Sequence, residues 1–144
     1  MDVLKAKLYG TWSIVSYESR IGQDVSYPFG KDVVGQLKYG PDGKMSAQLM
    51  QSGRSKVSSV DVYVGSEKEL TAIGYLAYFG TFDVDEEKGI VTHYVEGALF
   101  PRWVDTKLTR LYDLKANRLT LTTPPIQTKG EQIISVLVWE KISA

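Results

Sequence analysis

Three ionisable side chains near the middle of the chain have the residue types of an acid–base site. They are His93, Glu96 and Arg110, in the stretch VTHYVEGALFPRWVDTKLTRLY. His93 is the only histidine in the sequence, and histidine is the side chain whose unperturbed pKa lies near neutrality. His93 or Glu96 can move a proton, while a guanidinium stabilises negative charge that develops on a carbonyl oxygen. These three residues are therefore the candidate catalytic groups.

Alternation along residues 106–114 predicts where Arg110 points. Successive side chains of a strand face opposite sides of the sheet. The set that contains Lys107 and Asp113 carries two of the three charges and should face water. Arg110 then faces inward together with Tyr112. A guanidinium stays charged inside a protein and needs a partner.

Residues 90–98 also alternate, but their two faces are harder to distinguish. The face with His93 has more apolar residues than the face with Glu96. We therefore expect His93 to face inward, and the opposite register brings Glu96 inward instead. Either register places one ionisable side chain of this segment in the interior.

Strand signals dominate the rest of the chain, with turn residues between them. The predicted strands are residues 11–20, 33–39, 44–50, 76–84, 90–98, 106–114, 118–123 and 132–142. Short helices are predicted at residues 2–8 and after the capping box at residues 66–69, leading into residues 70–77. The order contains no alternation of strands with long helices. We therefore predict an all-β fold, with residues 1–144 forming one domain, an eight-stranded up-and-down antiparallel barrel with one or two short helices.

Composition narrows the classes of function. Seventeen basic and 17 acidic residues cancel, and no basic run favours nucleic acid. No stretch approaches ~20 apolar residues, and the N-terminus does not resemble a secretory signal, so we expect a cytoplasmic protein without membrane contact. There is no cysteine. We expect no metal site and no cofactor, because one histidine makes no ligand cluster and no phosphate-binding glycine loop is present. A neutral surface permits a homodimer.

The segment GTWSIVSYESR is similar to the first strand of lipocalins and fatty-acid-binding proteins, which carry Gly-x-Trp at its foot. Together with YPFGKDVVGQLKYGPDGKMSAQLM, YLAYFGTFDVD and VTHYVEGALFPRWVDTKLTRLYDL, it resembles the small lipocalin-like domain family of bacteria and fungi. The resemblance covers about residues 9 to 141 and implies the barrel. The family usually places glycine where this chain has Asp105.

The resemblance also implies which side of the first strand faces inward. In that pattern Trp12 points into the barrel, which puts Ser16 and Glu18 on the same interior face. Glu18 is then the first candidate partner for Arg110, and Glu96 is the second. These two carboxylates complete the candidate set of acid–base residues.

The role of Arg110 remains open at this stage. In the family that the chain resembles, a basic side chain often packs across the Gly-x-Trp tryptophan, and either Arg110 or Lys141 can take that position against Trp12. Arg110 can equally form a structural ion pair near the barrel floor. The third possibility is that it binds a carboxylate, enolate or phenolate of a ligand.

Polar and aromatic side chains with inward parity, or near strand ends, are candidates for contact with a small apolar or aromatic ligand. They are Ser16, Tyr39, Met45, Tyr78, Trp103 and Tyr112. A closed barrel of eight strands has room for side chains or for one small ligand.

Three functions fit these features. The first is a cofactor-free isomerase, cyclase or dehydratase of secondary metabolism, which binds a small hydrophobic or aromatic metabolite and uses acid–base chemistry. The alternative is a non-catalytic carrier or sensor that holds such a ligand in the same cavity. The third is a module with a filled core whose surface binds a protein.

Overall fold

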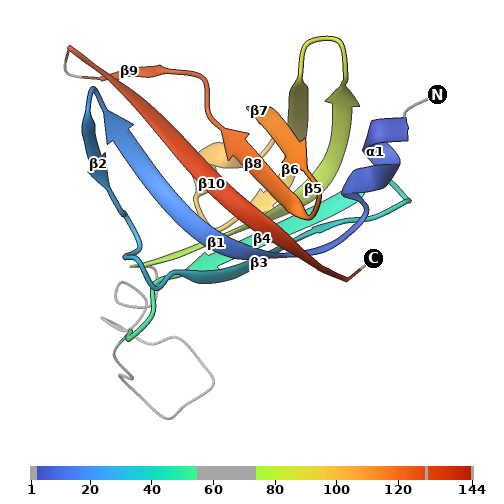
Figure 1. Cartoon of the computed structure of the whole chain (residues 1–144), viewed down its shortest axis with the longest axis horizontal. Helices are drawn as coiled ribbons and strands as arrows, with labels where there is room; N and C mark the ends of the chain where they lie inside the picture. Colours follow the sequence, from blue (N-terminus) through green and yellow to red (C-terminus); the bar gives the residue numbers. More distant parts are fainter. Residues whose placement is uncertain (1–2, 55–73, 129, 144) are drawn as a thin grey trace.

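The structure is a computed structural model that describes residues 3–54, 74–128 and 130–143. This part contains one α-helix, α1 (Val3–Leu8), and one 3-10 turn, η1 (Pro101–Trp103) (Figure 1). The strands are β1 (Gly10–Ile21), β2 (Asp24–Ser26), β3 (Val34–Tyr39), β4 (Lys44–Met50), β5 (Tyr75–Asp85), β6 (Ile90–Ala98), β7 (Lys107–Lys115), β8 (Arg118–Thr122), β9 (Ile126–Thr128) and β10 (Glu131–Ser143).

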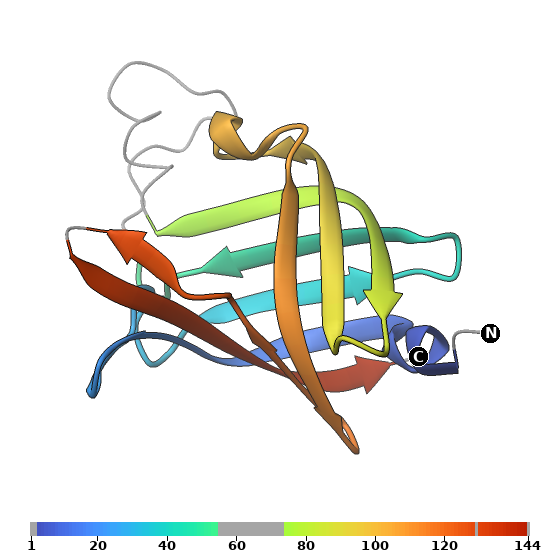
Figure 2. The ribbon, with the colours of Figure 1, turned by 90° about the horizontal axis from the view of Figure 1, so that it is seen from above.

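The predicted barrel is confirmed. Each long strand pairs antiparallel with the next along the chain, and β10 pairs with both β8 and β1, which closes the sheet into eight strands. The short strands β2 and β9 were not predicted. They pair antiparallel with the ends of β1 and β10 at one end of the barrel (Figure 2). The predicted capping box at residues 66–69 lies outside the described residues, whereas residues 75–77 belong to β5.

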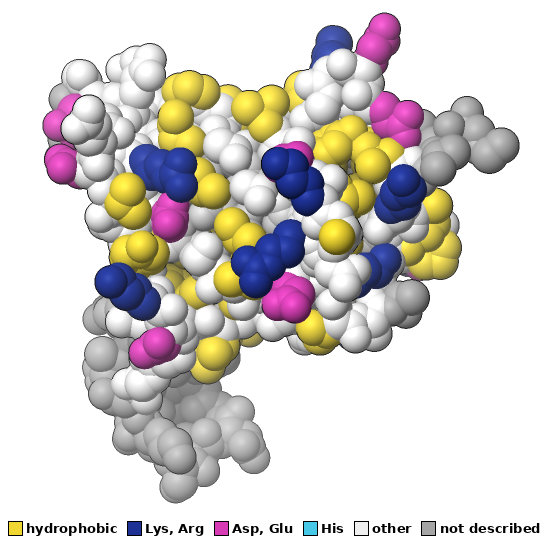
Figure 3. Space-filling view, viewed as in Figure 1, with side chains coloured by type: hydrophobic (Ala, Val, Ile, Leu, Met, Phe, Trp, Pro, Cys, Tyr) yellow, Lys and Arg dark blue, Asp and Glu magenta, His cyan; other side chains and the backbone are white. Residues whose placement is uncertain are grey.

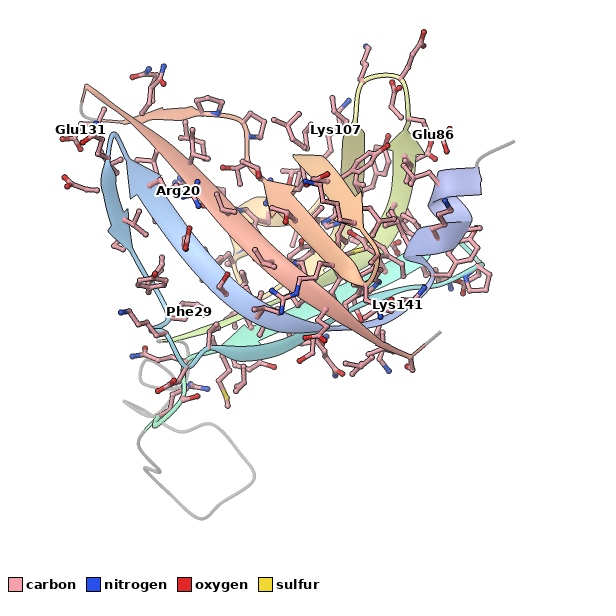
Figure 4. The ribbon with its side chains drawn as sticks, viewed as in Figure 1. Arg20, Phe29, Glu86, Lys107, Glu131 and Lys141 are labelled. Atoms are coloured by element: carbon pink, nitrogen blue, oxygen red, sulfur yellow. The ribbon has the colours of Figure 1, made fainter. Side chains whose placement is uncertain are left out.

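Helix α1 covers the end of the barrel opposite β2 and β9 (Figures 1 and 2). Leu8 and Trp12 are fully buried there, and the Trp12 indole Nε1 donates a hydrogen bond of 2.9 Å to the Leu8 carbonyl. Lys141, and not Arg110, packs across Trp12, with Nζ 5.5 Å from the ring centroid (Figure 4). The same Nζ donates to the Lys7 carbonyl at 3.1 Å. Arg110 is thus left for another role.

The interior is built in part from the alternating faces of β3 and β4. Leu37, Tyr39, Met45, Ala47 and Leu49 are buried, while the intervening β3 residues are exposed. Side chains of the other strands complete the core, because period-two alternation gives every strand one apolar face.

A β-bulge interrupts β1 and changes the face of every residue that follows it. Ile14 pairs with Trp139, but Ser16 pairs with the adjacent Val138, so that Val15 is an extra residue in β1. One extra residue shifts the period-two alternation by one position. The predicted inward face of the first strand is therefore correct only up to Ile14.

Asp105 follows η1 and adopts a left-handed backbone conformation, with φ at 63°. Its N–H donates to the Val95 carbonyl at 3.0 Å, which fixes the return of the chain into β7. Left-handed backbone suits glycine best and is tolerated by aspartate. This conformation gives a physical reason why glycine is usual at this position in the family that the chain resembles.

We expect Asp105→Val to lower the free energy of unfolding by about 1–2 kcal/mol, because a β-branched residue is strained at positive φ. Asp105→Gly should stay within about 0.5 kcal/mol of the unmodified protein. Urea unfolding of the two variants measures this difference. Equal stability of the valine and glycine variants would show that the left-handed conformation at this position has no energetic consequence.

No helix in the described part of the chain is long and apolar enough to cross a membrane. On the face shown in Figure 3, the Lys and Arg side chains are interspersed with Asp, Glu and apolar side chains. This face therefore has no broad patch of a single charge.

Candidate functional site

A largely enclosed cavity of about 230 Å³ lies inside the barrel. Its walls come from all eight barrel strands, from β9 and from η1. The lining residues are Tyr17, Leu37, Ala47, Leu49, Leu76, Tyr78, His93, Trp103, Leu108, Arg110, Leu121, Thr123, Ile126, Ser135, Leu137 and Trp139. This is an apolar chamber with a few polar groups, the usual form of a small-molecule site.

A larger hollow of about 670 Å³ lies on the outer surface of the barrel, around Lys38, Phe79 and Glu96. It is shallow and open to solvent, and Phe79 is more than half exposed. Enclosure excludes water and strengthens each polar contact with a ligand, so the interior cavity is the better candidate site.

Arg110 supplies the one charged side chain among the described residues that line the interior cavity. The side chain is half-buried, and its Nη1 donates to the Thr109 carbonyl at 3.0 Å. No Asp or Glu is among the lining residues, and no carboxylate in the described part of the chain lies within ion-pair distance of Arg110. The cavity wall thus carries a positive charge.

The predicted pairing of Arg110 with Glu18 is wrong. Glu18 pairs with Arg20, whose Nη2 lies 2.7 Å from Glu18 Oε2 (Figure 4). The bulge in β1 is the physical reason, because it turns Tyr17 into the cavity, where Ser16 and Glu18 were expected. Neither Ser16 nor Glu18 lines the cavity.

The second predicted partner of Arg110 was Glu96, and it is also not in the cavity. Glu96 is exposed and lines the outer hollow, whereas His93 on the same strand is 1% exposed and lines the cavity. Of the two registers considered for residues 90–98, the structure has the one that turns His93 inward. His93 and Arg110 therefore share the cavity, whereas Glu96 lies on the outer surface of the barrel.

His93 is held between two tyrosine hydroxyl groups. Its Nε2 lies 2.6 Å from the Tyr39 hydroxyl oxygen, and its Nδ1 lies 2.8 Å from the Tyr78 hydroxyl oxygen. The three residues come from β3, β5 and β6, so the contact spans non-adjacent strands of the barrel. Tyr78 and His93 line the cavity, whereas Tyr39 lies behind them in the core.

The direction of these two hydrogen bonds follows from what each tyrosine can reach. A neutral imidazole has one N–H and one bare nitrogen. The Tyr39 hydroxyl is buried and has no other partner in the described part of the chain, so it must donate its proton to Nε2. Nδ1–H of His93 then donates to the Tyr78 oxygen. The Tyr78 proton is left to point into the cavity.

Burial keeps this network neutral. Burial, with a smaller effect from the charge of Arg110, lowers the pKa of His93 from its usual 6.5 to about 3. Burial raises the pKa of Tyr78 to about 12 and that of Tyr39 well above its ordinary value, and Arg110 partly offsets both. Both tyrosines therefore keep their protons at neutral pH, and His93 has none to give beyond the one bonded to Tyr78.

Of the other predicted ligand-binding residues, some line the cavity and some do not. Tyr78 and Trp103 line the cavity, and their rings pack edge to face with centroids 5.5 Å apart. Tyr39 reaches the cavity only through His93. Met45 and Tyr112 pack in or against the core but do not line the cavity.

Sequence reasoning missed several lining residues. Tyr17 was missed because the bulge in β1 changes the face on which it lies. Trp139 is 2% exposed, and its indole N–H is buried without a hydrogen-bond partner in the described part of the chain. Thr123 was also missed, and its Oγ1 accepts a hydrogen bond of 2.9 Å from the Ser135 N–H.

Residues 9–142 match the family model described as a lipocalin-like domain. The chain is also 32% identical over 107 residues to the 4'-hydroxy-3'-methoxypropiophenone carrier protein ppsC of Aspergillus oryzae. The aligned region covers 68% of this chain and 96% of that protein.

Proposed function

The chain belongs to the lipocalin-like domain family, and we propose that it is a carrier that holds one small aromatic metabolite inside its barrel without changing it. The observation that carries this proposal is the enclosed apolar cavity with hydrogen-bond donors on its wall. A relative named as a carrier of an aromatic ketone supports the same reading.

The size of the cavity limits the ligand. At about 230 Å³, it is smaller than the ~300–1,000 Å³ of pockets that take drug-sized molecules. One aromatic ring with short substituents is the expected size. Tyr17, Trp103 and Trp139 supply aromatic walls, and aromatic rings favour stacked or edge-to-face contact with a flat ligand.

We expect 4'-hydroxy-3'-methoxypropiophenone to bind with a stoichiometry of one per chain and a dissociation constant of about 10 µM or tighter. Trp103 and Trp139 line the cavity, so quenching of tryptophan fluorescence reports occupancy. Leu121→Trp places a larger side chain on the cavity wall and should weaken binding at least about tenfold, which is ~1.4 kcal/mol.

The matched control is Leu111→Trp. Leu111 lies on β7, next to β8, and is 44% exposed on the outer face, so the same substitution leaves the cavity unchanged. Affinity should remain that of the unmodified protein. Equal binding by all three proteins would place the ligand outside the barrel and contradict the proposal.

Cofactor-free proton transfer is a second candidate, supported by one observation. Arg110 and the Tyr78 hydroxyl face the same cavity and can together stabilise an enolate oxygen. The cavity offers less support for a group that would transfer the proton. Both ring nitrogens of His93 are engaged and its pKa is lowered to about 3, while neither Glu18 nor Glu96 lines the cavity. Mass spectrometry of the ligand after incubation with the protein separates the two functions, and we expect the ligand to be recovered unchanged.

A further inference from the structure

We propose that the cavity takes its ligand as an anion, with the ionised oxygen of an acidic phenol held by Arg110 and Tyr78. The bound phenol is then ionised at pH values where the free molecule is protonated. This inference rests on the proposed carrier function and adds the chemical form and orientation of the ligand.

The first support is the charge of the cavity wall. Arg110 lines the cavity, and no carboxylate among the described lining residues neutralises it. The ion pairs found in the described part of the chain lie elsewhere, and two of them join exposed side chains, Lys115 with Asp113 and Arg118 with Glu140. A cation in a partly enclosed site favours the ionised form of an acid placed beside it.

The reach of that charge is visible in its effects on neighbouring residues. Burial raises the pKa of Tyr17 and of Tyr78, and in both cases the charge of Arg110 acts in the opposite direction. These two tyrosines lie on β1 and β5 and both line the cavity. The positive potential of Arg110 therefore extends across the cavity.

The second support is the direction of the hydrogen bonds. Because Tyr39 donates to His93 and His93 donates to Tyr78, the Tyr78 hydroxyl keeps its proton free for a ligand. Thr123 Oγ1 already accepts from a backbone N–H.

Arg110 and Tyr78 thus both offer hydrogen-bond donors to a ligand in the cavity. A phenolate oxygen accepts several hydrogen bonds and donates none, whereas a neutral phenol must find an acceptor for its own proton. His93 acts here as a positioning residue that keeps the Tyr78 proton directed at the ligand.

The test is an absorbance titration with 4'-hydroxy-3'-methoxypropiophenone, whose phenolate absorbs at longer wavelength than its neutral form. The pH is held about one unit below the pKa of the free probe, where about a tenth of it is ionised. We expect the bound probe to show the phenolate spectrum. 3'-Methoxypropiophenone lacks the hydroxyl group and is smaller, and it should bind at least about tenfold more weakly.

Variants then assign the effect to the charge. Arg110→Gln should lose the phenolate spectrum of the bound probe, and Arg110→Lys should keep part of it because the charge remains. Arg118→Gln removes an exposed arginine of β8 and should behave as the unmodified protein. The spectrum of the unmodified protein decides the matter alone if an Arg110 variant does not fold.

The outcomes distinguish this inference from the carrier function. If both probes bind with similar affinity and the phenolic probe stays neutral, the cavity is a carrier site for neutral ligands and the inference is overturned. If neither probe binds, the carrier function fails and this inference fails with it. A phenolate spectrum that persists unchanged in Arg110→Gln contradicts the role of Arg110.

Discussion

Replacing His93 with leucine is expected to lower the free energy of unfolding by about 2–4 kcal/mol at pH 7. Leucine has a similar volume but cannot bond to the hydroxyl groups of Tyr39 and Tyr78, which now lie 2.6 Å and 2.8 Å from the ring nitrogens. A buried hydroxyl left without a partner costs about 1–3 kcal/mol. Urea unfolding followed by tryptophan fluorescence gives the measurement.

A second substitution separates loss of the hydrogen bonds from loss of packing. Tyr39→Phe should cost about 1–2 kcal/mol in the unmodified protein, because it leaves Nε2 of His93 unpaired. In the His93→Leu background it removes an unpaired hydroxyl and should be neutral or stabilising. The two residues should therefore show a coupling energy of about 1 kcal/mol or more. Additive effects would mean that the Tyr39–His93 contact makes no net contribution to stability.

The stability advantage of the unmodified protein over His93→Leu should disappear on acidification. His93 in the folded state has a pKa of about 3, against about 6.5 in the unfolded chain. Between these values the unfolded chain binds a proton that the folded protein does not, so stability falls as the pH falls. The loss is about 1.4 kcal/mol for each pH unit below about 6.5. Above that pH the contribution of His93 is complete and constant.

Urea titrations of both proteins at a series of pH values between about 7 and 3.5 test this. The carboxylates contribute equally to the pH dependence of stability in both proteins. The difference in free energy of unfolding between the two proteins therefore isolates the contribution of His93. The difference should reach zero at about pH 3.5 to 5, from the 2–4 kcal/mol expected at neutral pH and the slope of ~1.4 kcal/mol per pH unit. A difference that does not change with pH would show that His93 titrates alike in the folded and unfolded states.

Strand alternation predicted much of the interior correctly because it depends on local sequence alone. On β6, Val91 and Val95 share a face with His93, and all three are buried. On β7 the same reasoning placed Arg110 on the inner face, where it lines the cavity. His93 and Arg110, together with Tyr78 and Trp103, are the cavity residues that the sequence could provide.

The first strand shows where local reasoning stops. The bulge at Val15 depends on the register between β1 and β10, which lie at opposite ends of the chain. Nothing in the alternation of residues 11–20 indicates it. The consequence is that Tyr17 lines the cavity, and that Glu18 pairs with Arg20 and not with the cavity arginine.

Trp139 was missed for a different reason. It follows the nearly continuous apolar run IISVLV in β10, and a run without polar residues does not identify its inward face. The structure buries Val136 and Trp139 and leaves the intervening Leu137 and Val138 half-buried. Long-range packing decides which of these side chains reaches the cavity.

The His93 network was also beyond sequence reasoning, because it joins residues on three strands. Tyr39 and Tyr78 were each expected to contact a ligand, but their hydroxyl groups meet on one imidazole. This contact makes His93 a part of the structure that orients Tyr78. That His93 itself moves protons stays a prediction.

A crystal structure of the complex with 4'-hydroxy-3'-methoxypropiophenone is the most direct measurement of whether the barrel holds a ligand. We expect the aromatic ring inside the interior cavity, with its phenolic oxygen within hydrogen-bond distance of the Arg110 guanidinium and the Tyr78 hydroxyl. Ligand density confined to the outer surface of the barrel, with the interior cavity unchanged, would contradict it.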